Sequence, residues 1–146
     1  MRTILYFAFC LAALLAGAER AGAQAPGYRV VVNAANSTSS ITRDELARVY
    51  LKKMTAWKSG APVAVVDQSP RSAVRAQFSS AILGRDVPTM KNYWQQSLFS
   101  GRGVPPVEQA SDEQVLSFVA SNQGAIGYVS PGASLPSSVK VVEITR

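Results

Sequence analysis

The chain contains 146 residues and no histidine, and its 15 Lys and Arg residues outnumber its 9 Asp and Glu residues, for a formal net charge of +6. Without histidine a Ser-His-Asp triad cannot be built, and the single cysteine, Cys10, excludes an intrachain disulfide and a cysteine-rich zinc site. The acidic residues are scattered, which indicates no metal-binding loop. The basic residues form no cluster with interleaved aromatic residues, which indicates no nucleic-acid partner. We therefore expect a protein that is not an enzyme and holds no cofactor or metal.

The first 23 residues have the organisation of a secretory signal peptide. Arg2 gives a positively charged start, residues 4–18 form an almost unbroken apolar run, and small residues occupy 21–23. The run is shorter than the roughly 20 residues that a membrane-spanning helix needs, so no stable span is expected once the leader is removed. The sequence thus predicts a periplasmic protein.

Cleavage after Ala23 would leave a mature domain over residues 24–146, and cleavage after Ala25 is the alternative. The mature part would carry 13 basic and 8 acidic residues, a net charge of +5, and would lack Cys10. A positive balance suits an anionic ligand or an anionic surface.

The mature part predicts alternating strands and helices. Residues 28–33 (YRVVVN) are rich in β-branched residues and predict a strand. Thr42 and Glu45 have the spacing of a capping box, and apolar residues at helical spacing then predict a helix that ends near Lys52 and Lys53. The later predicted elements are a strand over 61–66, a helix starting at Ser69-Pro70, a helix over 88–99, a helix capped by a second box at 111–114, and strands over 125–129 and 139–144. This alternation indicates a single α/β domain with helices packed on a sheet.

Three segments resemble the phosphate-binding proteins that serve ABC transporters. VVVNAAN (30–36) followed by ITRDELARVYLKKMTAWKSG (41–60) is similar to a strand ending in Val-Asn, a helix reading roughly Leu-Thr-x-Glu-x-Leu-x-x-Ile-Phe, and a Trp-x-x-Gly turn in that family. GAIGYVSPG (124–132) resembles a Gly-Ala-Ile-Gly-Tyr segment of the same family, and NYWQQSLFSGRGVPP (92–106) resembles its short, single-lobe relatives. The resemblance extends over nearly all of the mature chain.

The resemblance implies an α/β fold made of a single three-layer lobe of a type II periplasmic binding protein, in which a mixed sheet is flanked by helices. Two-lobed members hold the anion in the cleft between lobes, whereas this chain has room for one lobe. The implied function is solute-binding-like recognition of phosphate or another small oxyanion for ABC-type uptake or sensing, alone or as a dimer that rebuilds the cleft. The implied partners are that oxyanion and an ABC permease or another envelope protein.

The candidate ligand site is the turn at which the second helix begins. Helix N-termini attract anions, and Arg71 and Arg75, four residues apart, would share one helix face and reach the same oxyanion. The family pattern at this turn is Arg-x-Asp-x-Ser-Gly-Thr; Asp67 and Ser69 match it, whereas the arginine, glycine and threonine positions differ. The expected anion ligands are Asp67, Ser69, Arg71, Ser72 and Arg75.

Other interpretations of these residues stay open. The turn could be an ordinary capped helix start with solvated arginines, and the hydroxyl-rich loop 36–40 a plain connector. The chain could be a single-lobe envelope interaction or accessory module that has lost ligand binding, and a hydrolase would have to depend on a carboxylate or on a lysine-activated serine. The large aromatic residues Phe78, Tyr93, Trp94 and Phe99 are expected in the core.

Overall fold

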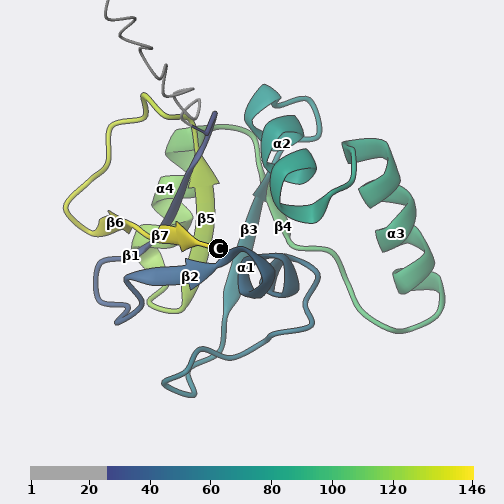
Figure 1. The fold of residues 1–146 in the computed structure, drawn as a ribbon, viewed down its shortest axis with the longest axis horizontal. Helices are drawn as coiled ribbons and strands as arrows, with labels where there is room; N and C mark the ends of the chain where they lie inside the picture. The colour runs from purple at the N-terminus through teal and green to yellow at the C-terminus, as the bar shows by residue number, and fades with distance from the viewer. Residues whose placement is uncertain (1–25) are drawn as a thin grey trace, which may run out of the picture.

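The computed structural model describes residues 26–146, so the predicted leader over residues 1–23 and its cleavage sites lie outside the described residues. The centre of the molecule is a five-stranded sheet with the order β4-β3-β5-β1-β6 (Figure 1). β3 is parallel to β4 and β5, whereas β1 is antiparallel to β5 and β6, so the sheet is mixed. Its strands are β1 (Arg29–Asn33), β3 (Ala64–Gln68), β4 (Val107–Gln109), β5 (Ala125–Val129) and β6 (Val139–Val141).

The strand predicted over 139–144 is divided between two sheets. β6 pairs with β1, and β7 (Glu143–Thr145) pairs in parallel with β2 (Ser40–Thr42) in a separate two-stranded sheet. Between them, buried Val142 still donates its backbone N–H to the Val30 carbonyl at 2.9 Å. β2 and β4 were not predicted, because three-residue strands carry too little alternation to be recognised in a sequence.

Four α-helices and one π-helical turn complete the fold. They are α1 (Arg43–Tyr50), α2 (Ala73–Phe78) continuing into the π-helix η1 (Ser79–Leu83), α3 (Val87–Phe99) and α4 (Asp112–Ser121). The capping box of Thr42 and Glu45 is confirmed at the start of α1, and left-handed Lys52 (φ 54°) follows its end. Ser111 caps α4, but the Gln114 side chain accepts a hydrogen bond from the Ala110 N–H and does not close the second box. None of the helices in residues 26–146 is long and apolar enough to cross a membrane.

The second helix begins later than the sequence indicated. The prediction of a start at Ser69-Pro70 is wrong, because β3 continues to Gln68 and the Ser69 N–H still donates to the Gln109 carbonyl of β4 at 2.9 Å. Residues 69–72 form a turn, closed by a 2.9 Å hydrogen bond from the Ser72 N–H to the Ser69 carbonyl. Ser72 is the N-cap of α2 and accepts from the Arg75 N–H at 3.3 Å.

Side chains of the central strands alternate between two apolar layers. Val31, Val66 and Val129 pack against α4, whereas Ile126 and Tyr128 belong to the core beneath α1, α2 and η1. Period-two alternation places successive strand residues on opposite faces, so the sheet is covered on both sides. The predicted three-layer α/β fold is therefore confirmed.

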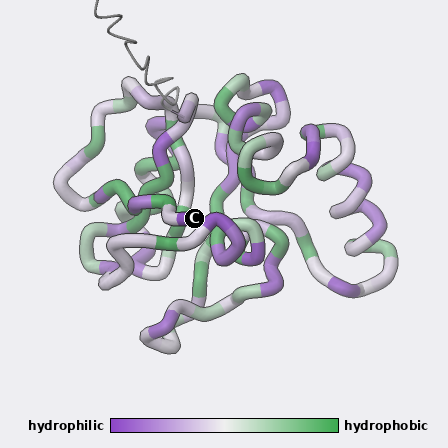
Figure 2. Tube along the Cα trace, viewed as in Figure 1, coloured by the Kyte–Doolittle hydropathy of each residue, from purple (hydrophilic) through white to green (hydrophobic). Residues whose placement is uncertain are grey.

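Helix α3 lies beyond the β4 edge of the sheet, away from β1 and β6 (Figure 1). Much of its length is coloured as hydrophilic in Figure 2, in contrast to the apolar central strands. Trp94 is buried, as predicted, and so is Met90, but Phe99 is 93% exposed, so its predicted place in the core is wrong. Helix α3 therefore buries one narrow face and leaves its C-terminal end apolar and uncovered.

Candidate functional site

The candidate site is built around a buried carboxylate at the carboxyl end of β3. Asp67 is 7% exposed, and its Oδ1 accepts hydrogen bonds from the Tyr128 hydroxyl and, at 2.8 Å, from the Gln68 N–H. Its Oδ2 lies 3.4 Å from Nη2 of Arg75. Burial raises the pKa of Asp67 above its usual value, because removal from water disfavours the charged form more than these partners favour it.

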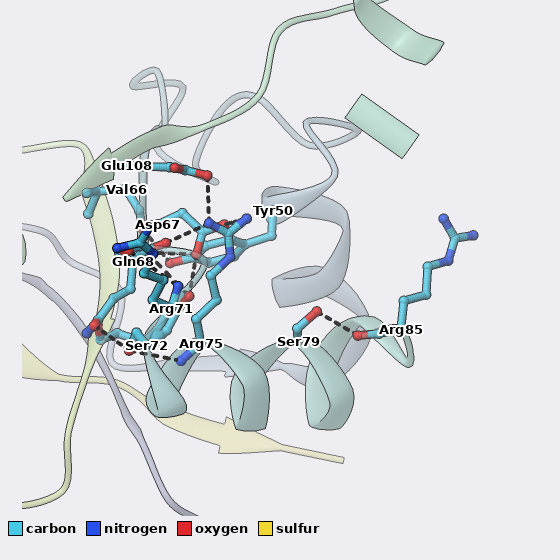
Figure 3. A network of polar contacts seen from close by, with 12 residues as sticks. Tyr50, Val66, Asp67, Gln68, Arg71, Ser72, Arg75, Ser79, Arg85 and Glu108 are labelled. Atoms are coloured by element: carbon cyan, nitrogen blue, oxygen red, sulfur yellow. Dashed lines mark hydrogen bonds and ion pairs between the residues drawn. The ribbon is translucent and has the colours of Figure 1, made fainter. Parts of the chain in front are cut away.

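The Arg75 guanidinium joins two carboxylates from neighbouring strands (Figure 3). Its side chain is 8% exposed, and Nη1 lies 2.6 Å from Oε1 of Glu108 and donates to the Gln68 carbonyl at 2.6 Å. Asp67 and Glu108 are directly opposite each other in the register of β3 and β4, which is why one guanidinium reaches both. A buried arginine so satisfied is fixed in position.

The Gln68 side chain connects the starts of two helices. Its Nε2 donates to Oδ1 of Asp112 at 2.7 Å and to the Tyr128 carbonyl at 3.0 Å, and its Oε1 accepts from the Ser72 hydroxyl at 2.9 Å. Gln68 is 3% exposed, so these bonds satisfy an amide that would otherwise be costly to bury. The first turns of α2 and α4 are thereby held against the end of β3.

The structure brings three of the five expected ligand residues together. Asp67, Ser72 and Arg75 share one hydrogen-bonded network, whereas Arg71 is exposed and Ser69 is half-buried in the turn before α2. The Ser69 hydroxyl accepts from the Arg71 N–H at 3.3 Å. The expectation that Arg71 and Arg75 share a helix face is wrong, because α2 begins only at Ala73.

Four further members of the network were not foreseen. They are Gln68, Glu108, Tyr128 and Asp112, and the first three take part because the strand order sets β4 and β5 on either side of β3. The only sequence signal was the Gly-Ala-Ile-Gly-Tyr segment that contains Tyr128.

The hydrogen-bonded network borders a very small cavity on one side and a large groove on the other. Asp67, Arg75 and Tyr128 line an internal cavity of about 10 Å³, which holds one water at most. On the solvent side of Arg75 and Glu108 lies a groove of about 620 Å³, bounded by α3 and the segment entering β4. Within residues 26–146 no three acidic side chains are grouped so as to hold a metal ion.

Comparison with solved structures relates this fold to a family. No protein-family model and no curated protein sequence matches the chain. An ABC-type phosphate transport receptor from Vibrio cholerae is similar, with a TM-score of 0.64 and 26% identity over 81% of this chain and 46% of that chain. A putative phosphate ABC transporter substrate-binding protein with bound phosphate from Clostridium perfringens gives a TM-score of 0.65 and 23% identity over 81% and 44% of the two chains.

A third structure, a possible phosphate-binding protein from Planctomyces limnophilus, gives a TM-score of 0.60 and 20% identity over 82% of this chain and 41% of that chain. The resemblance inferred from sequence is thus confirmed at the level of the fold, although this chain spans less than half of each matched structure. The described residues have the fold of a single lobe of phosphate-type ABC transporter substrate-binding proteins.

Proposed function

We propose that this protein is an exported, non-enzymatic, solute-binding-like protein that recognises phosphate or another small oxyanion for ABC-type uptake or sensing. The observation that carries the proposal is the position of Arg75, a buried guanidinium at the carboxyl end of β3, in a fold shared with phosphate-binding structures. Guanidinium groups bind oxyanions through paired, charge-assisted hydrogen bonds. The net charge of +5 on residues 24–146 favours the approach of an anion.

Of the five proposed ligand residues, four would contact the anion and one would hold the Arg75 side chain in position. Arg71, Ser69 and Ser72 lie in the turn that leads to Arg75, and hydroxyl and guanidinium groups there would donate to the anion's oxygens. Asp67 bears a carboxylate and would position Arg75 rather than donate to the ligand.

Export and partners belong to the same proposal. The leader pattern of residues 1–23 supports secretion to the periplasm, with residues 24–146 as the binding domain and an ABC permease or another envelope protein as partner. Mass spectrometry of the exported protein should find Gln24 as the first residue; a chain that still begins at Met1 would contradict cleavage.

Titration calorimetry of the mature protein against phosphate and sulfate tests the proposed ligand. A saturable signal is expected, and Arg71→Ala should weaken it about tenfold or more, the value of one lost charge-assisted hydrogen bond. Arg48→Ala, which removes an exposed arginine from α1, is the matched control and should bind like the unmodified protein. Flat traces with every small anion would contradict the proposal.

A second candidate is the single-lobe interaction or accessory module, and one observation favours it. Within residues 98–107, Leu98, Phe99, Val104 and Val107 are between 52% and 93% exposed. Apolar surface of this kind marks protein contact sites. This alternative predicts flat anion titrations and an envelope partner whose binding is lost in Phe99→Ser but retained in Val141→Ser, at the opposite β6 edge.

A further inference from the structure

The groove beside the candidate site has the size and walls of a small-molecule site. Its volume of about 620 Å³ falls within the roughly 300–1,000 Å³ that ligand pockets occupy. Its apolar walls include Val87, Trp94 and Leu98 from α3 and Pro105 from the segment before β4. An inorganic oxyanion would leave these apolar walls without a partner, so the groove suits a ligand with an apolar body.

Three charged side chains line the same groove. Arg75 and Glu108 line it together, and Lys91 of α3 also lines it. Lys91 is exposed and takes part in none of the ion pairs formed within residues 26–146. Two cations therefore face the groove against one carboxylate, which favours an anionic end on the ligand.

Glu108 holds the position on Arg75 that a ligand carboxylate would take. Its Oε1 lies 2.6 Å from Nη1 of Arg75, and its side chain is 45% exposed, so it can turn into water and recover hydration. The cavity behind Arg75 measures only about 10 Å³, too little for an anion, whereas the groove on its other side has ample room for one. If the ligand replaced Glu108, Arg75 would exchange one carboxylate partner for another, and its buried ion pair with Asp67 would stay intact.

We propose that the groove binds an organic carboxylate with a short apolar body, whose carboxylate displaces Glu108 from Arg75 while Lys91 provides a second positive charge. The inference rests on the proposed solute-binding function, because both use Arg75, and it names a ligand class for that function. The apolar body packs between α3 and Pro105, so affinity should rise by about fourfold for each methylene buried.

Titration calorimetry of the mature protein with sodium hexanoate, sodium acetate and hexanamide tests the inference. Hexanoate should bind, and acetate should bind about sixtyfold more weakly or worse, because it lacks four methylenes of which at least about three would be buried. Hexanamide should give no signal because it lacks the charge. Glu108→Gln should tighten hexanoate binding about tenfold, since a neutral amide competes poorly for a guanidinium. Leu98→Asp should weaken it about tenfold or more, by removing apolar contact and adding a like charge.

Asp44→Asn is the matched control for Glu108→Gln, because it removes one exposed carboxylate from α1 and should leave hexanoate binding unchanged. Thermal melts of each variant verify that the fold is retained.

Hexanoate binding that is insensitive to both Glu108→Gln and Leu98→Asp would overturn the inference. Phosphate binding without hexanoate binding would overturn it and leave the proposed function standing, whereas silence with both ligands would overturn both. Hexanoate binding without phosphate binding would support the inference and remove phosphate as the ligand.

Discussion

The Arg75 side chain lies between the carboxylates of Asp67 and Glu108, and these two contacts differ in their surroundings. The Asp67 side chain is 10% exposed and that of Glu108 is 45% exposed. Removal of the guanidinium would leave the buried Asp67 carboxylate without a cation, which is far more costly than the loss of a half-exposed pair. The stability of the site therefore depends mainly on the pair of Arg75 with Asp67.

We predict that Arg75→Ala lowers the free energy of unfolding by about 3–5 kcal/mol, the range for breaking a buried ion pair. Arg71→Ala, at an exposed position four residues earlier, should change it by less than about 0.5 kcal/mol. Urea denaturation followed by tryptophan fluorescence measures both. Equal effects of the two substitutions would show that Arg75 is not held in the buried network. The expected loss of stability is also why Arg71→Ala is the better test of anion binding.

The Asp67 carboxyl makes stability depend on pH in a defined direction. Burial raises its pKa in the folded state, so the folded protein binds this proton more tightly than the unfolded chain does. The contribution of Asp67 to stability is then fully present below the unfolded pKa of about 3.9 and is lost as pH rises through the folded pKa. The unmodified protein should thus lose stability relative to Asp67→Asn as pH rises from about 4 toward neutrality. Urea midpoints across this range check the sign; a difference that grows in the opposite direction would contradict it.

At the scale of elements, the contact between β5 and α4 leaves no room for a side chain at Gly127. A Cβ there would lie 2.8 Å from Cγ1 of Val115 and 2.8 Å from Cγ1 of Val66, well inside normal contact distance. Val66 belongs to β3, which pairs with β5, and Val115 belongs to α4, so a side chain there would push α4 away from the sheet. Gly127 therefore sets how closely α4 approaches the sheet.

We predict that Gly127→Ala lowers the free energy of unfolding by about 1–3 kcal/mol, the usual cost of overpacking a core. Gly132→Ala is the matched control, since nothing lies within 4 Å of a Cβ added there and its backbone is not left-handed. Chemical denaturation of the two variants gives the comparison. A Gly127→Ala protein as stable as Gly132→Ala would mean that α4 can shift without cost.

At the scale of the whole molecule, α3 is the element least joined to the rest. It lies beyond the β4 edge (Figure 1) and contacts η1. Its buried residues Met90 and Trp94 line the small cavity that Asp67 also lines. Trp57, by contrast, lies in the main core and donates its indole N–H to the Gly124 carbonyl at 2.9 Å. The two tryptophans thus report on different parts of one fold.

We predict that the mature protein unfolds in a single cooperative transition, because Trp94 lines the same small cavity as Asp67 and Arg75, whose network joins β3, α2 and α4. Fluorescence of the Trp57→Phe variant, which retains only Trp94, should follow the same urea curve as far-UV circular dichroism of that variant. An earlier fluorescence transition would show that α3 detaches before the sheet unfolds, and the groove with it.

Much of the fold could be predicted from local patterns. The capping box of Thr42 and Glu45, the cap at Ser111, and the apolar runs of β1 and β5 identified elements that the structure contains. Such signals are readable because caps and periodicity depend on residues only a few positions apart. The start of α2 could not be predicted in this way, since the Ser69 N–H is occupied by β4, forty residues later in the chain.

The sequence alone determined the α/β character of the chain, most of its helices and its longer strands, the absence of histidine-based chemistry and the resemblance to phosphate-binding proteins. Only the tertiary structure decided the strand order, the division of residues 139–145 between two sheets, and the pairing of Arg75 with Glu108. The physical reason is that composition and net charge follow directly from the residues of the chain. The partner of a buried charged side chain depends instead on which strands lie side by side. Arg75 became an internal ion pair facing a groove, rather than a solvated arginine beside Arg71, because β4 pairs with β3.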